Sequence, residues 1–386
     1  MSKIDELINK YCPDGVEYRE LGEVVNILDS QRKPVSKSNR KNGKYPYYGA
    51  NGIQDYVDDY IFDGTFILLG EDGSVINKDG SPVLNWATGK IWVNNHAHIL
   101  SEKIELAYLR YVYFALSVID VTKVVKGNIP KITQQNLRSF SIPIPPLPVQ
   151  EEIVKILDSF TELEQELEQE LELRKKQYEY YRNDLLTFGD EVEYKTLGEV
   201  GAIFDGTHQT PKYTTSGIKF VSVENIKSLY TSKKFISKLD YDKLYKIKPR
   251  LNDLFMTRIG SIGVCSVIDK EEDLAYYVTL TLIRPNLNIV ISKFLKYIIE
   301  SSIGQRELLK RTLVNATPIK INLGEVGKIT IPIPPIAEQE RIVTILDKFD
   351  ALVNDISIGL PAEIEARRKQ YEYYRDKLLT FKKLES

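Results

Sequence analysis

The sequence predicts an α+β protein with a pseudo-twofold internal duplication, in which two globular units are separated by two long antiparallel helices that form a coiled coil. Three observations predict this fold. A long helical stretch occurs twice, at residues 142–188 and 331–381. The segments that lead into the two copies are also similar to each other. Between these segments the chain holds short apolar stretches separated by Gly, Asn and Asp, which is typical of strands and turns.

Both helical stretches carry the apolar spacing of a coiled coil. Each follows a proline pair, which cannot continue a strand or lie inside a helix. In the first copy, apolar and aromatic residues alternate at spacings of three and four from Ile153 to Phe188, and only Arg174 interrupts them. The second copy has the same phase from Leu346 to Phe381. We therefore expect two long helices that pack along one seam.

The second helix is expected to break, whereas the first is not. The second contains Gly359 and Pro361, and a proline inside a helix costs about 3 kcal/mol or more. Proline is tolerated, however, in the first turn of a new helix. We predict a break or sharp kink near 357–361 and an unbroken first helix over about 149–188, which would act as a rigid strut.

The repeat extends through the whole chain. A period this long indicates a domain duplication rather than a solenoid. Residues 15–27 match 191–203, residues 132–150 match 321–339, and residues 174–188 match 367–381. The expected domains are a globular unit at 1–148, a helix at 149–188, a second globular unit at 189–335 and a second helix at 336–386.

The order of the repeated segments is that of a circular repeat that is opened at the chain termini, which we call the cut circle. After Phe188 it continues into the segment that begins the second unit, whereas the similar segment that should follow Phe381 lies at the N-terminus. We therefore expect the second helix to return to the first unit and the two termini to lie close together.

Each unit is expected to combine short strands with a few helices. In the first unit we expect strands at 65–70, 73–76, 91–93 and 97–100, and helices at 3–9 and 106–118. In the second we expect strands at 220–223, 253–257, 263–267 and 278–283, and helices at 292–301 and 304–313. The inserts between the repeated segments do not align. Unlike inserts in a duplicated frame indicate one shared role for the frame and two different roles for the inserts, although drift of two old copies is an alternative.

Composition and charge distribution limit the possible partners. The two cysteines, Cys12 and Cys265, lie far apart, which suggests a reducing compartment and no disulfide framework. No secretory leader and no apolar run of membrane-spanning length is visible, so we expect a cytoplasmic protein with no membrane contact. The net charge is −2, with a balance of 0 over 1–150, −6 over 151–188, +5 over 189–335 and −1 over 336–386. A polyanion would be met by the globular units rather than by the first helix.

The usual catalytic and metal-binding motifs are absent from the sequence. It contains no phosphate-binding Walker loop, no Cys/His cluster of zinc spacing and no Gly-x-Ser-x-Gly motif. We therefore expect no catalytic residue and no metal ligand. Three alternatives remain open: a nuclease or methyltransferase that uses Asp240 and Asp242 or the Glu71-Asp72 turn, half a metal site at His96 and His98 instead of a polar strand face, and a coiled-coil scaffold joining two protein-binding modules.

Polar, aromatic and amide side chains gather in a similar region of both units. Asn and Gln can read adenine edges and Arg and Lys guanine edges, while lysines also hold phosphates. Any one of these residues is also compatible with an ordinary surface turn. The candidate nucleic-acid contacts are Lys44, Tyr45, Tyr48, Asn51, Asn95, Lys126, Asn128, Lys131, Thr207, His208, Gln209, Lys212, Asn225, Arg258, Asn315 and Lys320.

The ends of the two helices are nearly identical. Residues 174–188 and 367–381 share 12 of 15 positions, several of them polar. Packing along a seam does not require identical polar residues, so we interpret them as a docking surface for a shared partner, with recent gene conversion as the alternative. The candidate partner-binding residues are Gln177, Tyr178, Tyr181, Arg182, Gln370, Tyr371, Tyr374 and Arg375.

Taken together, these motifs resemble the specificity subunits of type I restriction-modification systems. The paired IPxPP…Q…IVxILDxF and RxKQYEYYRxxLLTF segments are similar to the conserved regions of that family, and the resemblance covers the whole chain. The stretches YYGANGIQDYVDDYIFDG and DGTHQTPKYTTSGIKFVSVENI look like two target recognition domains.

The resemblance implies a non-catalytic subunit that binds double-stranded DNA at a bipartite target with an unread spacer. It also implies two modification subunits, which carry S-adenosylmethionine and methylate adenine, and restriction subunits, which use ATP and Mg²⁺. No cofactor is then expected in this chain.

Overall fold

The computed structural model describes residues 2–103, 106–125, 130–355 and 357–385. The chain divides into two compact units. Unit 1 consists of Met1–Leu167 together with Ile364–Ser386, and unit 2 is Glu168–Glu363. The C-terminal helix therefore returns to the unit that holds the N-terminus, as the cut circle predicts.

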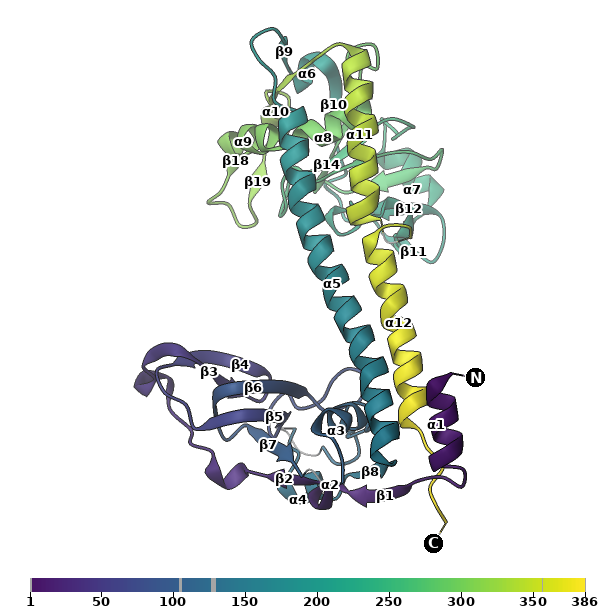
Figure 1. The fold of residues 1–386 in the computed structure, drawn as a ribbon. Helices are drawn as coiled ribbons and strands as arrows, with labels where there is room; N and C mark the ends of the chain where they lie inside the picture. Colours follow the sequence, from purple (N-terminus) through teal and green to yellow (C-terminus); the bar gives the residue numbers. More distant parts are fainter. Residues whose placement is uncertain (1, 104–105, 126–129, 356, 386) are drawn as a thin grey trace. The chain divides into compact units, whose positions relative to one another are not determined.

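Unit 1 is built on a six-stranded sheet (Figure 1). In sheet order its strands are β2 (Val25–Ile27), β7 (Ala97–Glu102), β5 (Phe62–Gly70), β6 (Leu84–Val93), β3 (Asn42–Gly49) and β4 (Gly52–Val57). Neighbours are antiparallel except β3 and β6, which are parallel. Its other elements are α1 (Lys3–Tyr11), β1 (Glu17–Glu20), α2 (Leu21–Val24), η1 (Asp29–Gln31), η2 (Lys37–Asn39), α3 (Leu109–Leu116), α4 (Gln134–Arg138) and β8 (Ser141–Ile144).

The apolar run in β5 is continuous because both faces of the sheet are covered. Side chains alternate between faces along a strand. Ile67 and Leu69 belong to the core that also contains α3 and residues of the two long helical stretches. Phe66 and Leu68 belong to a second cluster on the other face. The sequence therefore identified this strand correctly.

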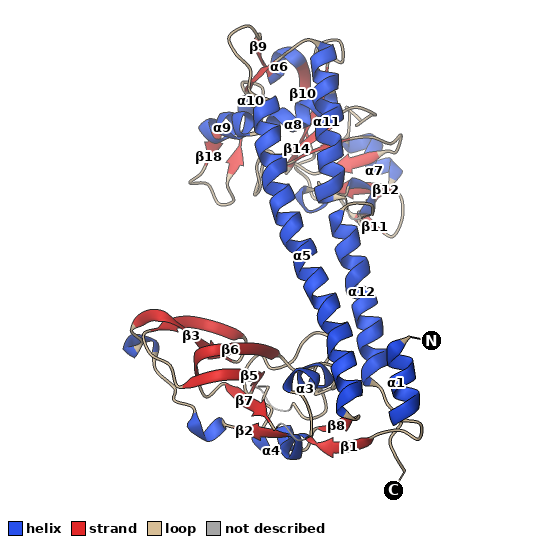
Figure 2. Ribbon diagram, in the orientation of Figure 1, coloured by secondary structure: helices blue, strands red, loops and turns tan. Residues whose placement is uncertain are grey.

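Unit 2 replaces the single sheet with two smaller ones (Figure 2). One has the order β10 (Gly201–Asp205), β17 (Leu280–Pro285), β14 (Leu254–Thr257), β15 (Cys265–Val267), and the other β11 (Tyr213–Thr214), β13 (Phe235–Ile236), β12 (Ile218–Val221), β16 (Leu274–Tyr276). The strands β18 (Thr312–Leu313) and β19 (Lys320–Ile321) form a separate two-stranded sheet. The remaining elements are β9 (Tyr194–Thr196), α6 (Leu197–Val200), η3 (Val223–Asn225), η4 (Leu229–Thr231), α7 (Lys238–Leu244), α8 (Ser292–Glu300), α9 (Ser302–Arg311), α10 (Leu323–Val326) and β20 (Thr330–Pro332).

The predicted duplication is confirmed by strand register. β1 pairs with β8 so that Tyr18 faces Pro143, and β9 pairs with β20 so that Tyr194 faces Pro332. These pairs occupy equivalent positions in the sequence repeat. We call the repeated segments the repeated frame. It consists of β1, α2, α4 and β8 in unit 1, and of β9, α6, α10 and β20 in unit 2, together with the start of the long helix that follows β8 or β20.

A buried glutamine closes the frame in the same way in both units. The Gln150 amide nitrogen donates to the carbonyls of Pro145 (2.7 Å) and Leu106 (3.1 Å), and its oxygen accepts from the Tyr108 amide at 3.0 Å. Gln339 repeats this pattern with Pro334, Ile289 and Ile291. Tyr108 and Ile291 are the N-cap residues of α3 and α8. Each glutamine thus joins its proline pair, the chain before the helix and the helix start.

The helix predictions are also confirmed. α5 (Leu147–Leu185) is unbroken over 39 residues, whereas α11 (Ile336–Asn354) ends before α12 (Leu360–Leu379) begins. Pro361 lies in the first turn of α12, where proline is tolerated. Gly359 approaches the end of α11 so closely that an added Cβ would lie 2.4 Å from the Ala351 carbonyl oxygen. The seam residue Ile356 lies outside the described residues.

Within each unit the helices pair antiparallel. In unit 1, Phe160 of α5 contacts Tyr374 of α12, and one turn further along α5, Glu164 pairs with Arg368, which lies earlier in α12. In unit 2 the second half of α5 packs against α11, where Tyr181 stacks on Phe349 with ring centroids 5.5 Å apart. The termini meet in unit 1, where Val16 donates to Lys382 and Leu384 donates to Val16, at 2.9 Å each (Figure 1).

Two of the short elements differ from the prediction. Residues 73–76 form no strand, because Val75 donates to the Gly73 carbonyl in a tight turn. The helix expected at 106–118 is shorter, since Tyr108 is held extended at the N-cap by Gln150. None of the described helices is both long enough and apolar enough to span a membrane.

Candidate nucleic-acid interface

Four segments of unit 1 meet where β5 ends. Glu71 donates its amide hydrogen to the His96 carbonyl and accepts from the Ile132 amide, at 2.8 Å each. Asn94 donates to the Tyr48 carbonyl at 3.0 Å, and an added Cβ on Gly70 would lie 3.2 Å from the Ala50 carbonyl oxygen. We call this the unit 1 edge. Its exposed or half-exposed side chains are Asn51, Asp72, Asn95, His96 and Lys131.

A buried charged network supports this edge. His98 is fully buried, and its Nδ1 lies 2.6 Å from Asp29 Oδ2 while its Nε2 lies 2.8 Å from the Ile132 carbonyl oxygen. Arg32 pairs with Glu71 at 2.5 Å and donates to the Ala97 carbonyl at 2.9 Å. We call Asp29, Arg32, Glu71 and His98 the buried network. It joins η1, the end of β5, the start of β7 and the segment before α4.

The network is balanced in charge without a metal ion. Both ring nitrogens of His98 face acceptor oxygens, the Asp29 carboxylate on one side and the Ile132 carbonyl on the other. Burial alone would raise the pKa of Asp29, but the hydrogen bond and charge of His98, with Arg32, outweigh it and lower that pKa below its ordinary value. Among the described residues, the Asp29, Glu71 and His98 ligand atoms come within 4.8 Å of one another. Since Arg32 already neutralises these carboxylates and Lys131 pairs with Glu71 at 3.2 Å, the group fits an ion-pair network rather than a metal site.

The other predicted residues of unit 1 are placed differently. Tyr48 is 9% exposed and packs in the cluster on the far face of the sheet, and burial raises the pKa of its hydroxyl. Lys44 and Tyr45 lie at the opposite end of β3 from Asn51, where Tyr45 contacts Tyr60. The structure therefore does not bring Lys44 and Tyr45 to the unit 1 edge. Lys126 and Asn128 lie outside the described residues.

In unit 2 a comparable edge forms around Arg258. Its guanidinium, only 7% exposed, pairs with Asp205 at 2.7 Å, and Asp205 also holds the exposed His208 at 2.8 Å. Arg258 accepts at its carbonyl from the Ile321 amide and donates its amide hydrogen to Thr279, at 2.9 Å each. Arg258 was predicted as a DNA contact. In the structure its guanidinium contacts the protein, and it positions Asp205 and through it His208.

The remaining candidates of unit 2 surround these loops. Thr207 accepts at its carbonyl from the Val278 amide at 3.0 Å, and its hydroxyl accepts from the Gln209 amide at 3.2 Å. Lys320 forms a β-bridge with Ile259 beside Arg258. Asn225 is half-buried in η3, while Gln209, Lys212 and Asn315 are exposed. We call Asp205, His208, Gln209, Arg258 and Lys320 the unit 2 edge.

Both edges present an exposed histidine through a similar arrangement. His96 is held by Asp72 at 2.5 Å next to the Arg32–Glu71 pair, as His208 is held by Asp205 next to Arg258. Sequence reasoning noticed the histidines and the Glu71-Asp72 turn but missed Asp29, Arg32 and Asp205. Sequence alone does not reveal these residues, because the contacts Arg32–Glu71, Asp29–Ile99 and Asp205–Arg258 join positions 39 to 70 residues apart.

The predicted partner-binding residues at the helix ends are engaged within their own unit. Tyr178 and Tyr181 contact Phe349, and Tyr371 and Tyr374 contact Phe160 in the same arrangement. Arg182 and Arg375 lie over the Tyr178 and Tyr371 rings, and Gln177 and Gln370 accept from Arg174 and Arg367.

Contacts within each unit therefore explain much of the identity between the helix ends. They include the polar residues, which we had expected packing along the seam not to require. The most exposed of the repeated aromatic side chains are Tyr180 (65%) and Tyr373 (63%), which the sequence analysis did not select, while the predicted Tyr181 is 38% exposed. The EYY triplet present in both copies was the signal that could have identified them.

Asp240 and Asp242, which the nuclease alternative would use, both have partners within the fold. Ser237 caps α7 by accepting from the Asp240 amide and donates to its carboxylate, and Asp242 pairs with Lys248 and, at 3.7 Å, with Lys238. The described part of unit 2 contains no group of three ligands suited to a metal ion.

Comparisons with known proteins agree on one family. A family model described as the type I restriction modification DNA specificity domain matches residues 13–173 and 189–366. A Haemophilus influenzae protein, provisionally named a type I restriction enzyme specificity subunit, is 38% identical over 95% of this chain and 96% of its own length. The Escherichia coli EcoR124I/EcoR124II specificity subunit is 34% identical over 86% of this chain and 90% of its own. The crystal structure of an S subunit from M. genitalium superposes with a TM-score of 0.60 over 95% of this chain and 96% of that one, at 15% identity, which indicates a shared fold.

Proposed function

The chain belongs to the family of type I restriction modification DNA specificity domains, and from this premise we propose that each of its two units reads one half of a bipartite DNA target. As a specificity subunit the chain is a recognition component rather than a catalytic one. In this proposal it acts in the cytoplasm.

The observation that carries the proposal is a duplicated frame that supports two unlike sheets. β1–β8 and β9–β20 share one register, and Gln150 and Gln339 make the same three hydrogen bonds. The frame holds one six-stranded sheet in unit 1 and two four-stranded sheets in unit 2. A shared frame serves a function common to both units, whereas different sheets present different side chains, as two unrelated half-sites require.

The two edges supply the chemistry for reading DNA. Each presents amide, imidazole and lysine side chains on loops that a buried ion pair fixes in place. Amide and imidazole groups can contact base edges in the major groove, and lysines can neutralise phosphates. We assign base reading to Asn51, Asn95, His208 and Gln209, and phosphate contact to Lys131, Lys212 and Lys320.

The repeated helices provide the docking surfaces for two modification subunits. Tyr180 and Tyr373 occupy equivalent positions, and each makes an edge-to-face contact with its neighbour, Tyr181 or Tyr374. Exposed tyrosines are common anchors at protein interfaces. In this proposal S-adenosylmethionine, ATP and Mg²⁺ are bound by the modification and restriction subunits rather than by this chain.

The test is a reconstitution with the full chain, the modification subunit and duplex DNA. The chain alone, given S-adenosylmethionine, ATP and Mg²⁺, should neither methylate nor cleave DNA, whereas the chain with the modification subunit should methylate it. The affinity of the complex for DNA should fall steeply with salt because phosphate contacts release counterions. Chemistry by the chain alone would support the enzyme alternative, and a complex whose DNA binding does not depend on the chain would support the scaffold alternative.

A further inference from the structure

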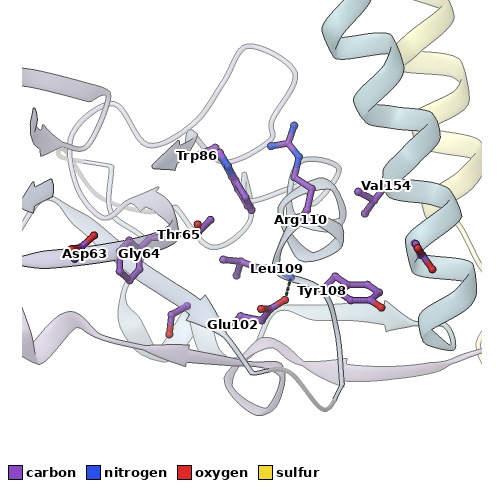
Figure 3. Close-up of a pocket in the computed structure, with 12 residues that line it drawn as sticks. Asp63, Gly64, Thr65, Trp86, Glu102, Tyr108, Leu109, Arg110 and Val154 are labelled. Carbon is purple, nitrogen blue, oxygen red and sulfur yellow. Dashed lines mark hydrogen bonds between the residues drawn. The ribbon is translucent and has the colours of Figure 1, made fainter. Parts of the chain in front are cut away.

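A groove in unit 1 lies between the six-stranded sheet and the helices α3 and α5 (Figure 3). Its main hollow has a volume of ≈ 680 Å³ and is lined by the start of β5, Trp86 on β6, the end of β7 and the first residues of α3. A second hollow of ≈ 440 Å³ extends it along α5, since Trp86, Arg110 and Val154 line both. We call the two hollows together the sheet–helix groove.

The groove is remote from the unit 1 edge. Gly64 lines the groove, and Gly70, on the same strand, adjoins the edge. Six strand residues at about 3.3 Å each separate them by about 20 Å. A DNA contact at the edge therefore does not occupy the groove.

The lining is strongly acidic. The one cation among the described lining residues, Arg110, is already paired with Asp158 at 2.7 Å and lies 4.9 Å from the Trp86 ring centre. Figure 3 shows Arg110 and Trp86 side by side at the mouth, and Glu102 hydrogen-bonded to the Leu109 amide at 3.1 Å. Against this one cation stand five carboxylates, Asp63, Glu102, Glu151, Asp158 and Glu162. A phosphate backbone would be repelled here, and a cationic segment would be attracted.

The floor of the groove is apolar. Phe66 is buried, Trp86 and Val154 are half-buried, and Tyr108 remains 40% exposed beside them. An apolar floor with an acidic rim fits a protein segment in which lysines or arginines flank an apolar side chain. The floor would supply the burial energy, and the rim the selectivity for positive charge.

The corresponding hollow of unit 2 does not share the acidic lining, as far as the described residues show. In unit 2 a hollow of ≈ 1060 Å³ lies at the equivalent place, and Lys293 and Asp347 take the positions of Arg110 and Asp158. That hollow is nearly balanced in charge, because four cations face five carboxylates. They are Arg182, Lys227, Lys293 and Lys296, and Asp269, Glu300, Asp347, Asp350 and Asp355.

We propose that the sheet–helix groove seats a basic segment of one modification subunit, the copy that docks on unit 1. This inference rests on the proposed function, which supplies the partner. The two halves of the repeated frame would bind the two modification subunits in the same way. The groove adds a contact that only the modification subunit on unit 1 makes. The two copies are therefore bound with unequal affinity.

The test uses the full chain in complex with the modification subunit. A photo-crosslinking residue in place of Tyr108 should react with a Lys- and Arg-rich segment of that subunit, whereas the same residue at Ile291, the equivalent N-cap in unit 2, should not react with that segment. Glu151→Lys should weaken the binding of one copy about tenfold, more at low salt than at high salt. The matched control is Glu340→Lys, at the equivalent exposed position on α11, which should leave both affinities unchanged. Far-UV circular dichroism and an unchanged thermal unfolding curve would verify that each variant keeps its fold.

Three results would overturn the inference: a Tyr108-site crosslink to DNA or to the restriction subunit, no crosslink in a complex of normal composition, or equal weakening by Glu151→Lys and Glu340→Lys. A chain that binds no modification subunit at all would overturn the proposed function as well. A normal two-copy complex without the crosslink would overturn this inference alone.

Discussion

At the scale of single residues, largely buried ion pairs fix the loops that we propose to contact DNA. Arg32–Glu71 and Arg258–Asp205 each join segments distant in sequence, with pairing distances of 2.5 and 2.7 Å. Such pairs add little net stability over apolar packing, but removing one partner leaves an unpaired buried charge. Here each pair adjoins the carboxylate that contacts an exposed histidine, Asp72 for His96 and Asp205 for His208.

Asp29→Ala should therefore destabilise unit 1 by about 3 to 5 kcal/mol, because it removes a buried carboxylate that pairs with Arg32 and is the closest partner of the fully buried His98 ring. Both tryptophans of the chain, Trp86 and Trp92, lie in unit 1, so tryptophan fluorescence during urea unfolding reports on that unit. Asp120→Asn, at an exposed loop carboxylate, should leave the unfolding curve unchanged.

The same variant has a pH signature. The pKa of Asp29 is lowered in the fold, so its contribution is complete above the ordinary Asp value of about 3.9 and is lost as pH falls through the lowered value. The stability difference between wild type and Asp29→Ala should shrink as the pH falls below about 4. A difference that stays constant would contradict the ion-pair assignment.

Base reading is also tested at single residues. Asn95→Ala and His208→Ala should each cost about 1 to 3 kcal/mol of DNA affinity and relax one position of the methylated motif, in different half-sites. Lys131→Ala and Lys320→Ala should instead weaken binding to all sequences and flatten its salt dependence. A wild-type motif and affinity in all four variants would show that another face contacts DNA.

At the scale of elements, the two halves of the repeated frame are stabilised by equivalent hydrogen bonds of a buried glutamine. Gln150→Ala and Gln339→Ala each leave three backbone groups without a side-chain partner, which should cost about 1 to 3 kcal/mol per buried group. Each unit has one buried thiol, Cys12 in unit 1 and Cys265 in unit 2, which reports local opening by its rate of alkylation. Gln150→Ala should accelerate only Cys12 and Gln339→Ala only Cys265. Acceleration of both thiols by one variant would mean that the units do not open independently.

The docking proposal also belongs to this scale. Tyr180→Ala and Tyr373→Ala should each remove one copy of the modification subunit, and the double variant both, because each tyrosine is exposed and truncating an anchor costs about 2 kcal/mol or more. Native mass spectrometry gives the stoichiometry directly. Tyr178→Ala and Tyr371→Ala serve as controls for packing, since these rings are turned toward Phe349 and Phe160. An unaltered two-copy complex in the double variant would place docking elsewhere.

At the scale of the whole molecule, the sequence predicted the repeat better than the inserts. The duplication, the unbroken α5, the break before Leu360 and the return of the C-terminal segment to Val16 all follow from local rules of spacing, proline chemistry and similarity. The strand at 73–76 was wrong, and the network around Asp29 was missed. The network depends on contacts between distant segments, which no periodicity encodes, whereas residues 73–76 leave the strand conformation in a tight local turn. Burial explains why Tyr48 and Arg258, polar in the sequence, face the interior.

The central claim is that the two units read DNA independently through one shared frame. The most direct measurement is to exchange residues 45–131 for the same span of a relative with a known target, and to map methylated adenines in the whole genome. The account predicts that one half of the bipartite motif changes to that of the relative while the other half stays as it was. A change in both halves, or in neither, would contradict it.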